Sequence, residues 1–115
     1  MRITLILNDA PYGSERTYNG LRLAMNLQKR DDVLVGVFLL GDAVTSALEN
    51  QQTPEGYYNI ARMIKAISRK GEVRICGTCM DTRGIASEML IERTKRSTMD
   101  ELTDWLTESE KTLTF

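Results

Sequence analysis

The chain has 115 residues, a formal net charge of −1 and no histidine. This length predicts one domain with its own hydrophobic core, and the near-zero charge gives no sign of nucleic-acid binding. No apolar run approaches the roughly 18 residues that span a bilayer, so neither nucleic acid nor membrane is an expected partner.

The first half of the chain alternates between strand-like and helix-like patterns. Residues 3–7 are apolar and predict a central strand, which ends at the turn-forming residues 8–13. Ser14 is the predicted N-cap of the helix that follows. Residues 33–40 are almost continuously apolar, which is typical of a strand covered on both faces. A short helix capped by Asp42 is expected after it.

The second half continues this alternation. After a polar loop at residues 50–56, residues 57–70 place apolar side chains on one face of a second long helix. Residues 72–76 predict a third strand. Residues 90–96 are charged, so any strand there is expected at an edge of the sheet or facing a partner.

The last segment predicts one more helix and a strand at residues 111–115. Thr98, with Glu101 three residues later, forms a capping-box pattern. The residues expected on the buried face of this helix are Met99, Leu102, Trp105 and Leu106.

Strands that alternate with helices predict an α/β fold. We expect a single domain over residues 1–115, with a mainly parallel sheet and helices on both faces, layered as in flavodoxin-like proteins. In open sheets of this kind the site lies beyond the carboxyl ends of the strands. Three loops, at residues 8–13, 41–42 and 76–84, follow such ends and are expected to converge.

Both cysteines, Cys76 and Cys79, lie directly behind the third predicted strand. A thiol between a strand end and a helix start meets unpaired backbone N–H groups and a positive dipole end, which favour the reactive thiolate. We predict Cys76 to be the more reactive thiol. The N-terminal apolar run is too short for a signal peptide, so a reducing cytoplasm is expected, where a cysteine pair is more often reactive than structural.

Other chemistries find little support in the residue types. Without histidine, one chain cannot form a Ser–His–Asp triad, a Cys–His pair or a His-ligated metal site. Two thiols are too few for a structural zinc site, and residues 8–13 lack the glycines of a dinucleotide-binding turn. Neither a metal nor a cofactor is predicted.

Three segments resemble a known family: NDAPYGSE at residues 8–15, GDAV at residues 41–44 and CGTCMDTRGI at residues 76–85. They are similar to the DsrE/DsrF-like family, most of all to its YchN-type branch, over essentially the whole chain. The resemblance implies a small α/β domain that forms trimers or hexamers, and a cysteine that carries sulfur as a persulfide in several members. In sulfur-relay members that cysteine falls on Cys76. Cys79 stands where those members generally lack a thiol and matches the YchN-type pattern.

The candidate site has two catalytic thiols, Cys76 and Cys79, and a set of anion- or substrate-binding residues. That set comprises Gly77, Thr78, Arg83, Asn8 and Tyr12. The fixed charge of Arg83 suits a thiolate, a persulfide or an anionic substrate, although an exposed arginine in a salt bridge fits the sequence equally well. Alternative interpretations are a small buried hydrophobe for Cys76, a helix-face residue without chemistry for Cys79 and a subunit-contact tyrosine for Tyr12.

The leading hypothesis is a cytoplasmic sulfur-handling protein that is not a hydrolase. In it Cys76 accepts sulfane sulfur from a donor protein, holds it as a persulfide and passes it to an acceptor. Two alternatives stay open: a non-catalytic oligomeric module that binds a ligand or partner, and a Cys76/Cys79 dithiol redox switch.

A homo-oligomer, trimer or hexamer, is expected for two reasons. One is the family resemblance. The other is a set of apolar residues that looks too large for a monomer of this size to bury. That set comprises Leu39, Leu40, Val44, Leu48, Met89, Leu90 and Ile91.

Overall fold

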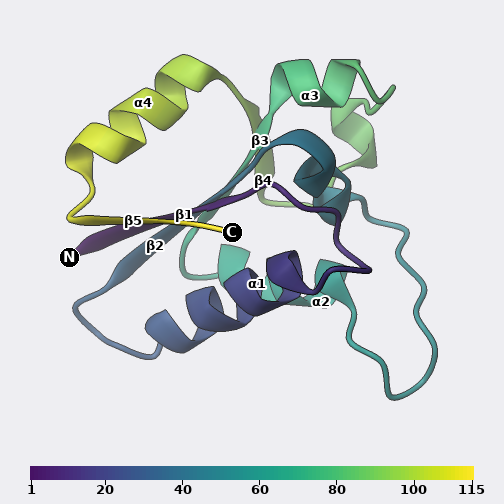
Figure 1. Cartoon of the computed structure of the whole chain (residues 1–115), viewed down its shortest axis with the longest axis horizontal. Helices are drawn as coiled ribbons and strands as arrows, with labels where there is room; N and C mark the ends of the chain where they lie inside the picture. Colours follow the sequence, from purple (N-terminus) through teal and green to yellow (C-terminus); the bar gives the residue numbers. More distant parts are fainter.

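A five-stranded parallel sheet forms the centre of the computed structural model, which describes all 115 residues (Figure 1). Its strands are β1 (Arg2–Leu7), β2 (Leu34–Leu39), β3 (Glu72–Cys76), β4 (Thr94–Ser97) and β5 (Lys111–Thr114). Their order is β4-β3-β2-β1-β5, and every neighbouring pair is parallel. The predicted α/β fold with three central parallel strands is confirmed, and the charged segment does form an edge strand.

Helices cover both faces of this sheet, as predicted. Two of them, α1 (Arg16–Leu27) and α2 (Ile60–Ser68), pack together on one face, and α4 (Met99–Glu108) lies on the other (Figure 1). The connections from β1 through β4 all advance in one direction, and right-handed crossovers then place their helices on one side. Only the return from β4 to β5 runs the other way, which brings α4 across the opposite face.

Three shorter segments complete the fold. The five-residue helix α3 (Gly77–Asp81) follows β3 directly, and two 3-10 turns, η1 (Gly41–Ala47) and η2 (Ser87–Met89), follow β2 and α3. Helix α3 contacts η1, and each of them also contacts β3. The carboxyl ends of β2 and β3 therefore carry the segments that shape the site. No helix of the chain is both long and apolar enough to cross a membrane.

The contact of α4 with the sheet depends on a glycine. Trp105 packs edge-on against Phe38 of β2, with ring centroids 5.8 Å apart. A Cβ at Gly36 would lie 2.8 Å from the Trp105 ring, closer than carbon atoms approach. Because Gly36 has no side chain, the indole of Trp105 can pack against the middle of β2.

Two helix starts differ from the prediction. Helix α1 begins at Arg16 after Glu15, which adopts a left-handed conformation (φ 66°), and Ser14 is not its cap. The Ser14 hydroxyl donates to Asp9 (2.8 Å) and accepts the N–H of Arg16 (3.3 Å), so it bonds the first residue of the helix from one position before the N-cap. Helix α2 begins at Ile60, where the Asn59 side chain accepts the Arg62 N–H at 3.1 Å. Asn59 was not recognised as the cap because it follows a polar loop, in which an asparagine does not stand out.

The prediction for the last helix was right about its cap and partly wrong about its buried face. The Thr98 hydroxyl accepts the Glu101 N–H at 3.2 Å. Of the four apolar residues expected inside, Leu102 and Trp105 are buried, whereas Met99 is 60% exposed. Leu106 is also exposed, because the stripe facing the sheet is narrower than the apolar pattern.

The prediction that one chain cannot bury its apolar residues was largely wrong. Leu39, Val44 and Ile91 are buried within one chain, and among the set only Met89 is an exposed large side chain. The reason is an antiparallel bridge between Leu48 and Leu90, which folds residues 89–91 onto the end of η1. Such a long-range pairing between two irregular segments leaves no periodic signal in the sequence.

Candidate functional site

The sulfur of Cys76 lies at the junction of β3 and α3. Cys76 is the N-cap of α3, and its Sγ accepts the backbone N–H of Cys79 at 3.3 Å. The Thr78 hydroxyl lies 3.2 Å from the same sulfur. Because the first N–H groups of a helix have no partner within it, a side chain at the N-cap receives them. The sequence therefore aims several donors at one thiol.

The two thiols have opposite pKa shifts. Burial raises the pKa of Cys76, but hydrogen bonds from the Cys79 thiol, the Thr78 hydroxyl and two backbone N–H groups outweigh it, and the net pKa is lowered. Burial and the hydrogen bond to Cys76 raise the pKa of Cys79, although the Gly41 N–H and the charge of Arg83 act against them. Of the two thiols, Cys76 is therefore the one that gives up its proton more readily.

The loop after β2 contacts the cysteine segment. Two of the three loops that were predicted to converge, at residues 41–42 and 76–84, therefore do so. The backbone N–H of Gly41 donates to Cys79 Sγ at 3.3 Å. Arg83 bridges the same two segments, with one Nη 2.8 Å from Asp42 Oδ1 and the other 3.0 Å from the Cys79 carbonyl oxygen. Asp42 is thus an ion-pair partner rather than the predicted helix cap.

Arg83 therefore acts beside Cys79 and not beside Cys76. Its charge is among the influences on the pKa of Cys79 and is absent from those on Cys76. In the structure Arg83 holds the turn after α3 against Asp42, and its predicted role toward an anion stays a prediction. The salt-bridge alternative considered from the sequence describes its contacts better.

The side chains of Asn8 and Tyr12 are engaged elsewhere. Asn8 Nδ2 donates to the carbonyl oxygen of Phe115 (3.2 Å), which fastens the end of β5. The Tyr12 hydroxyl donates to Gln51 (2.6 Å) and accepts the Ile60 N–H (3.1 Å). The strand order explains this separation, because β2 lies between β1 and the strand that carries Cys76.

A small pocket of about 170 Å³ opens beside Cys76, toward β4 and α4. The residues that line it are Cys76, Gly77, Thr78, Arg96, Ser97, Thr98 and Met99. Of the predicted site it contains Cys76, Gly77 and Thr78. Of the other four, Arg96 and Ser97 belong to β4, whose register against β3 pairs Cys76 with Ser97, and Thr98 and Met99 begin α4.

Arg96 is the site residue that sequence reasoning missed. Its guanidinium lies against Gly77, where an added Cβ would be only 2.8 Å from the guanidinium carbon. Asp81 fixes it there through two contacts, at 2.8 and 2.9 Å. The charge on Cys76 is one of the influences that raise the pKa of Arg96, after the hydrogen bond to Asp81. The sequence showed only that Arg96 is a basic residue in a predicted edge strand. Without the register of that strand against β3, its position beside Cys76 could not be predicted.

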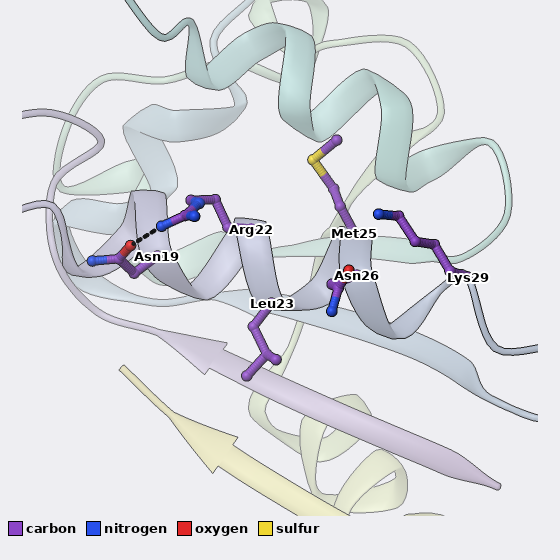
Figure 2. A pocket seen from close by; sticks show the side chains of 6 residues that line it. All are labelled: Asn19, Arg22, Leu23, Met25, Asn26 and Lys29. Atoms are coloured by element: carbon purple, nitrogen blue, oxygen red, sulfur yellow. Dashed lines mark hydrogen bonds between the residues drawn. The ribbon is translucent and has the colours of Figure 1, made fainter.

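A hollow of about 580 Å³ lies along α1 and contains neither thiol (Figure 2). Figure 2 shows Arg22, Met25 and Lys29 extending toward α2, whereas Leu23 points toward the sheet. This hollow contains no cysteine and no acidic side chain. No group of three or more His, Cys, Asp or Glu side chains gathers anywhere in the chain. The pocket beside Cys76 is thus the one that combines a thiol with an arginine.

With this geometry established, comparison with known proteins gives a family. A family model described as "DsrE/DsrF-like family" matches residues 1–115. The chain belongs to the DsrE/DsrF-like family. Protein YchN of Escherichia coli (strain K12) is 40% identical over 116 residues, covering 99% of this chain and 98% of that protein. Its crystal structure superposes with a TM-score of 0.93 over 99% and 98% of the two chains.

Other DsrE/DsrF-like relatives differ in what their names say. An uncharacterized protein of Methanocaldococcus jannaschii is 37% identical over 116 residues, which is 100% of both chains. A more distant relative, from Vibrio vulnificus, is named a sulfurtransferase TusD homolog; it is 26% identical over 90 residues, 76% of this chain and 69% of its own. The family assignment and the YchN likeness made from the sequence are confirmed.

Proposed function

We propose that this protein carries sulfane sulfur as a persulfide on Cys76 in a cytoplasmic relay between donor and acceptor proteins. The observation that supports this most is the set of hydrogen-bond donors around Cys76 Sγ, which favours the thiolate form of a side chain that lines a pocket. Membership of the DsrE/DsrF-like family and the distant likeness to a sulfurtransferase homolog support this chemistry.

Loading is a transfer between two sulfur atoms. The Cys76 thiolate attacks the terminal sulfur of a donor persulfide, a new S–S bond forms on Cys76, and the donor leaves as a thiolate with the electron pair of the broken bond. Unloading is the same step in reverse toward an acceptor thiolate. The N–H groups and the Thr78 hydroxyl that favour the thiolate also favour Cys76 as the leaving group, because a stabilised thiolate leaves faster.

A dithiol switch is the second candidate, favoured by the direct hydrogen bond between the two thiols. In it the two cysteines form a disulfide, and an oxidant takes up the two electrons. A loaded carrier has its own route to the same disulfide: Cys79 attacks the persulfide and the terminal sulfur leaves as sulfide. A third candidate is an oligomeric binding module without thiol chemistry.

Intact mass after exposure to polysulfide separates these functions. We expect a gain of about 32 Da, one sulfur atom, that maps to Cys76 and is absent from Cys76→Ser. A loss of about 2 Da, two hydrogen atoms, without prior loading supports the switch. An unchanged mass contradicts both thiol functions and favours the binding module. Cys79→Ser is the matched control, because it keeps Cys76 and cannot form the disulfide.

A further inference from the structure

The pocket beside Cys76 has the size of a site for a small ligand and one cationic side chain, Arg96, in its lining. Its volume of about 170 Å³ is below the roughly 300–1,000 Å³ typical of drug-sized ligands. Cys76 is 94% buried, so a reactant approaches its sulfur through this pocket. A thiolate by itself repels an anion. An anionic reactant therefore needs a cation in the same pocket to offset this repulsion.

Arg96 provides that cation in a fixed position. Two of its N–H groups are engaged by Asp81, which leaves the others available, since a guanidinium carries five. The ion pair with Asp81 and the contact with Gly77 restrict the side chain before any ligand arrives. An arginine held in this way loses little freedom on binding a planar or tetrahedral oxyanion.

Thr98 and Met99 add a second donor and an apolar side chain to the lining. The Thr98 hydroxyl accepts the Glu101 N–H, and its own proton has no acceptor within the protein. Met99, exposed on the first turn of α4, lines the same pocket with a thioether. The nearby Glu101 carboxylate is occupied by Ser97 and Arg74, at 2.6 and 2.9 Å.

We propose that this pocket binds a small sulfane-sulfur donor with an oxyanion head, of which thiosulfate is the simplest, and that Arg96 holds the head. The inference rests on the proposed persulfide chemistry of Cys76. The thiolate attacks the outer sulfur of thiosulfate, a Cys76 S–S bond forms, the S–S bond of thiosulfate breaks, and sulfite leaves with the electron pair. Charge balances, because one thiolate and one dianion give one persulfide anion and one sulfite dianion.

The test measures sulfite release from thiosulfate in the presence of a thiol acceptor. We expect saturable kinetics in the wild type, and in Arg96→Gln a rise in KM of at least about tenfold, the size of one lost charge-assisted hydrogen bond. Arg96→Lys keeps the charge without the planar fork and should recover part of the loss. Lys95→Gln is the matched control, because Lys95 is also a basic residue of β4 but does not line this pocket.

Two further measurements separate this inference from the proposed function. A neutral organic trisulfide has no oxyanion head: Cys76 attacks its central sulfur, a new S–S bond forms on Cys76, one S–S bond of the trisulfide breaks, and an alkyl thiolate leaves with the electron pair. The rate of this loading should be the same in the wild type and Arg96→Gln. If trisulfide loads Cys76 while thiosulfate releases no sulfite, the anion site is wrong and the carrier stands. If neither reagent loads Cys76, the proposed function fails.

Anion binding at this pocket can also be measured without sulfur transfer, through protection of Cys76 from alkylation. Sulfate should slow the alkylation of Cys76 by iodoacetamide in the wild type and in Lys95→Gln, and not in Arg96→Gln. Equal protection in all three proteins, or in none, would overturn the inference. Unchanged far-UV circular dichroism of the variants establishes that each one is folded.

Discussion

At the scale of single residues, two cysteines three positions apart behave differently because of which hydrogen bonds they receive. Cys76 receives donors from α3 and from the Cys79 thiol, whereas Cys79 receives one N–H and donates its own proton. The pKa of Cys76 is lowered and that of Cys79 is raised. The thiolate population at neutral pH, and with it the reactivity, should follow that order.

We expect Cys79→Ser, which retains Cys76, to react several-fold faster with iodoacetamide at pH 7 than Cys76→Ser. The serine hydroxyl in Cys79→Ser can still donate to Cys76, so the pKa of Cys76 should stay low. Alkylation rates against pH, measured on both variants, check this. A faster reaction of the variant that retains only Cys79 would mean that the nucleophile is assigned to the wrong cysteine.

Glu101 illustrates how charge and hydrogen bonding combine at one carboxylate. The hydroxyl of Ser97 is the main influence that lowers its pKa from 4.5, and the Arg74 guanidinium adds to it. Because the folded pKa lies below the unfolded one, the carboxylate stabilises the fold above the unfolded value, and that contribution is lost as the pH falls through the folded pKa.

Glu101→Gln should therefore lower the urea midpoint at pH 7 and have less effect at about pH 3, because below the unfolded value of 4.5 the contribution declines as the pH falls toward the folded pKa. Equilibrium unfolding at the two pH values measures this. Glu108→Gln is the control, since Glu108 lies on the same helix and forms no ion pair. A pH-independent difference between Glu101→Gln and the wild type would contradict the linkage.

At the scale of elements, the contact between α4 and β2 rests on the fit of one indole over one glycine. Gly36→Ala introduces a methyl 2.8 Å from the Trp105 ring and should destabilise the protein by about 1–3 kcal/mol, the usual cost of overpacking. Trp105 is the only tryptophan, so its fluorescence reports the transition directly. In a Trp105→Leu background, followed by circular dichroism, Gly36→Ala should cost less. Equal costs in both backgrounds would exclude this packing.

The loop after β1 belongs to the scaffold rather than to the thiol pocket. Tyr12→Phe removes hydrogen bonds to Gln51 and to the Ile60 N–H, and should cost about 1 kcal/mol or more in stability. The alkylation rate of Cys76 should be unchanged. A large change in that rate would return Tyr12 to the reactive site.

At the scale of the whole molecule, oligomerisation stays a prediction. One of its two reasons has weakened, because Leu39, Val44 and Ile91 are buried within one chain. The family resemblance remains, together with several exposed apolar side chains, among them Met25, Met89 and Met99. We expect light scattering at micromolar concentration to give a mass near three or six times that of the chain. A stable monomer of 13.0 kDa would contradict this.

The sequence by itself determined the elements and the place of Cys76 between a strand and a helix. The apolar runs of β1, β2 and β3 and the helical spacing between them follow from local backbone geometry and burial, which a single chain segment records. Cys76 at a strand end and Thr98 at a helix start were likewise readable, because capping involves residues within one turn of each other.

The tertiary structure decided what surrounds the nucleophile. Arg96 reaches Gly77 only because β4 pairs with β3 in a register that sets Ser97 beside Cys76, and no local pattern encodes that register. Asn8 and Tyr12 turn away because β2 separates β1 from β3, and the Leu48–Leu90 bridge hides side chains that looked surplus. Contacts between segments distant in sequence form only when the whole chain folds, so the cation of the pocket became visible only in the assembled sheet.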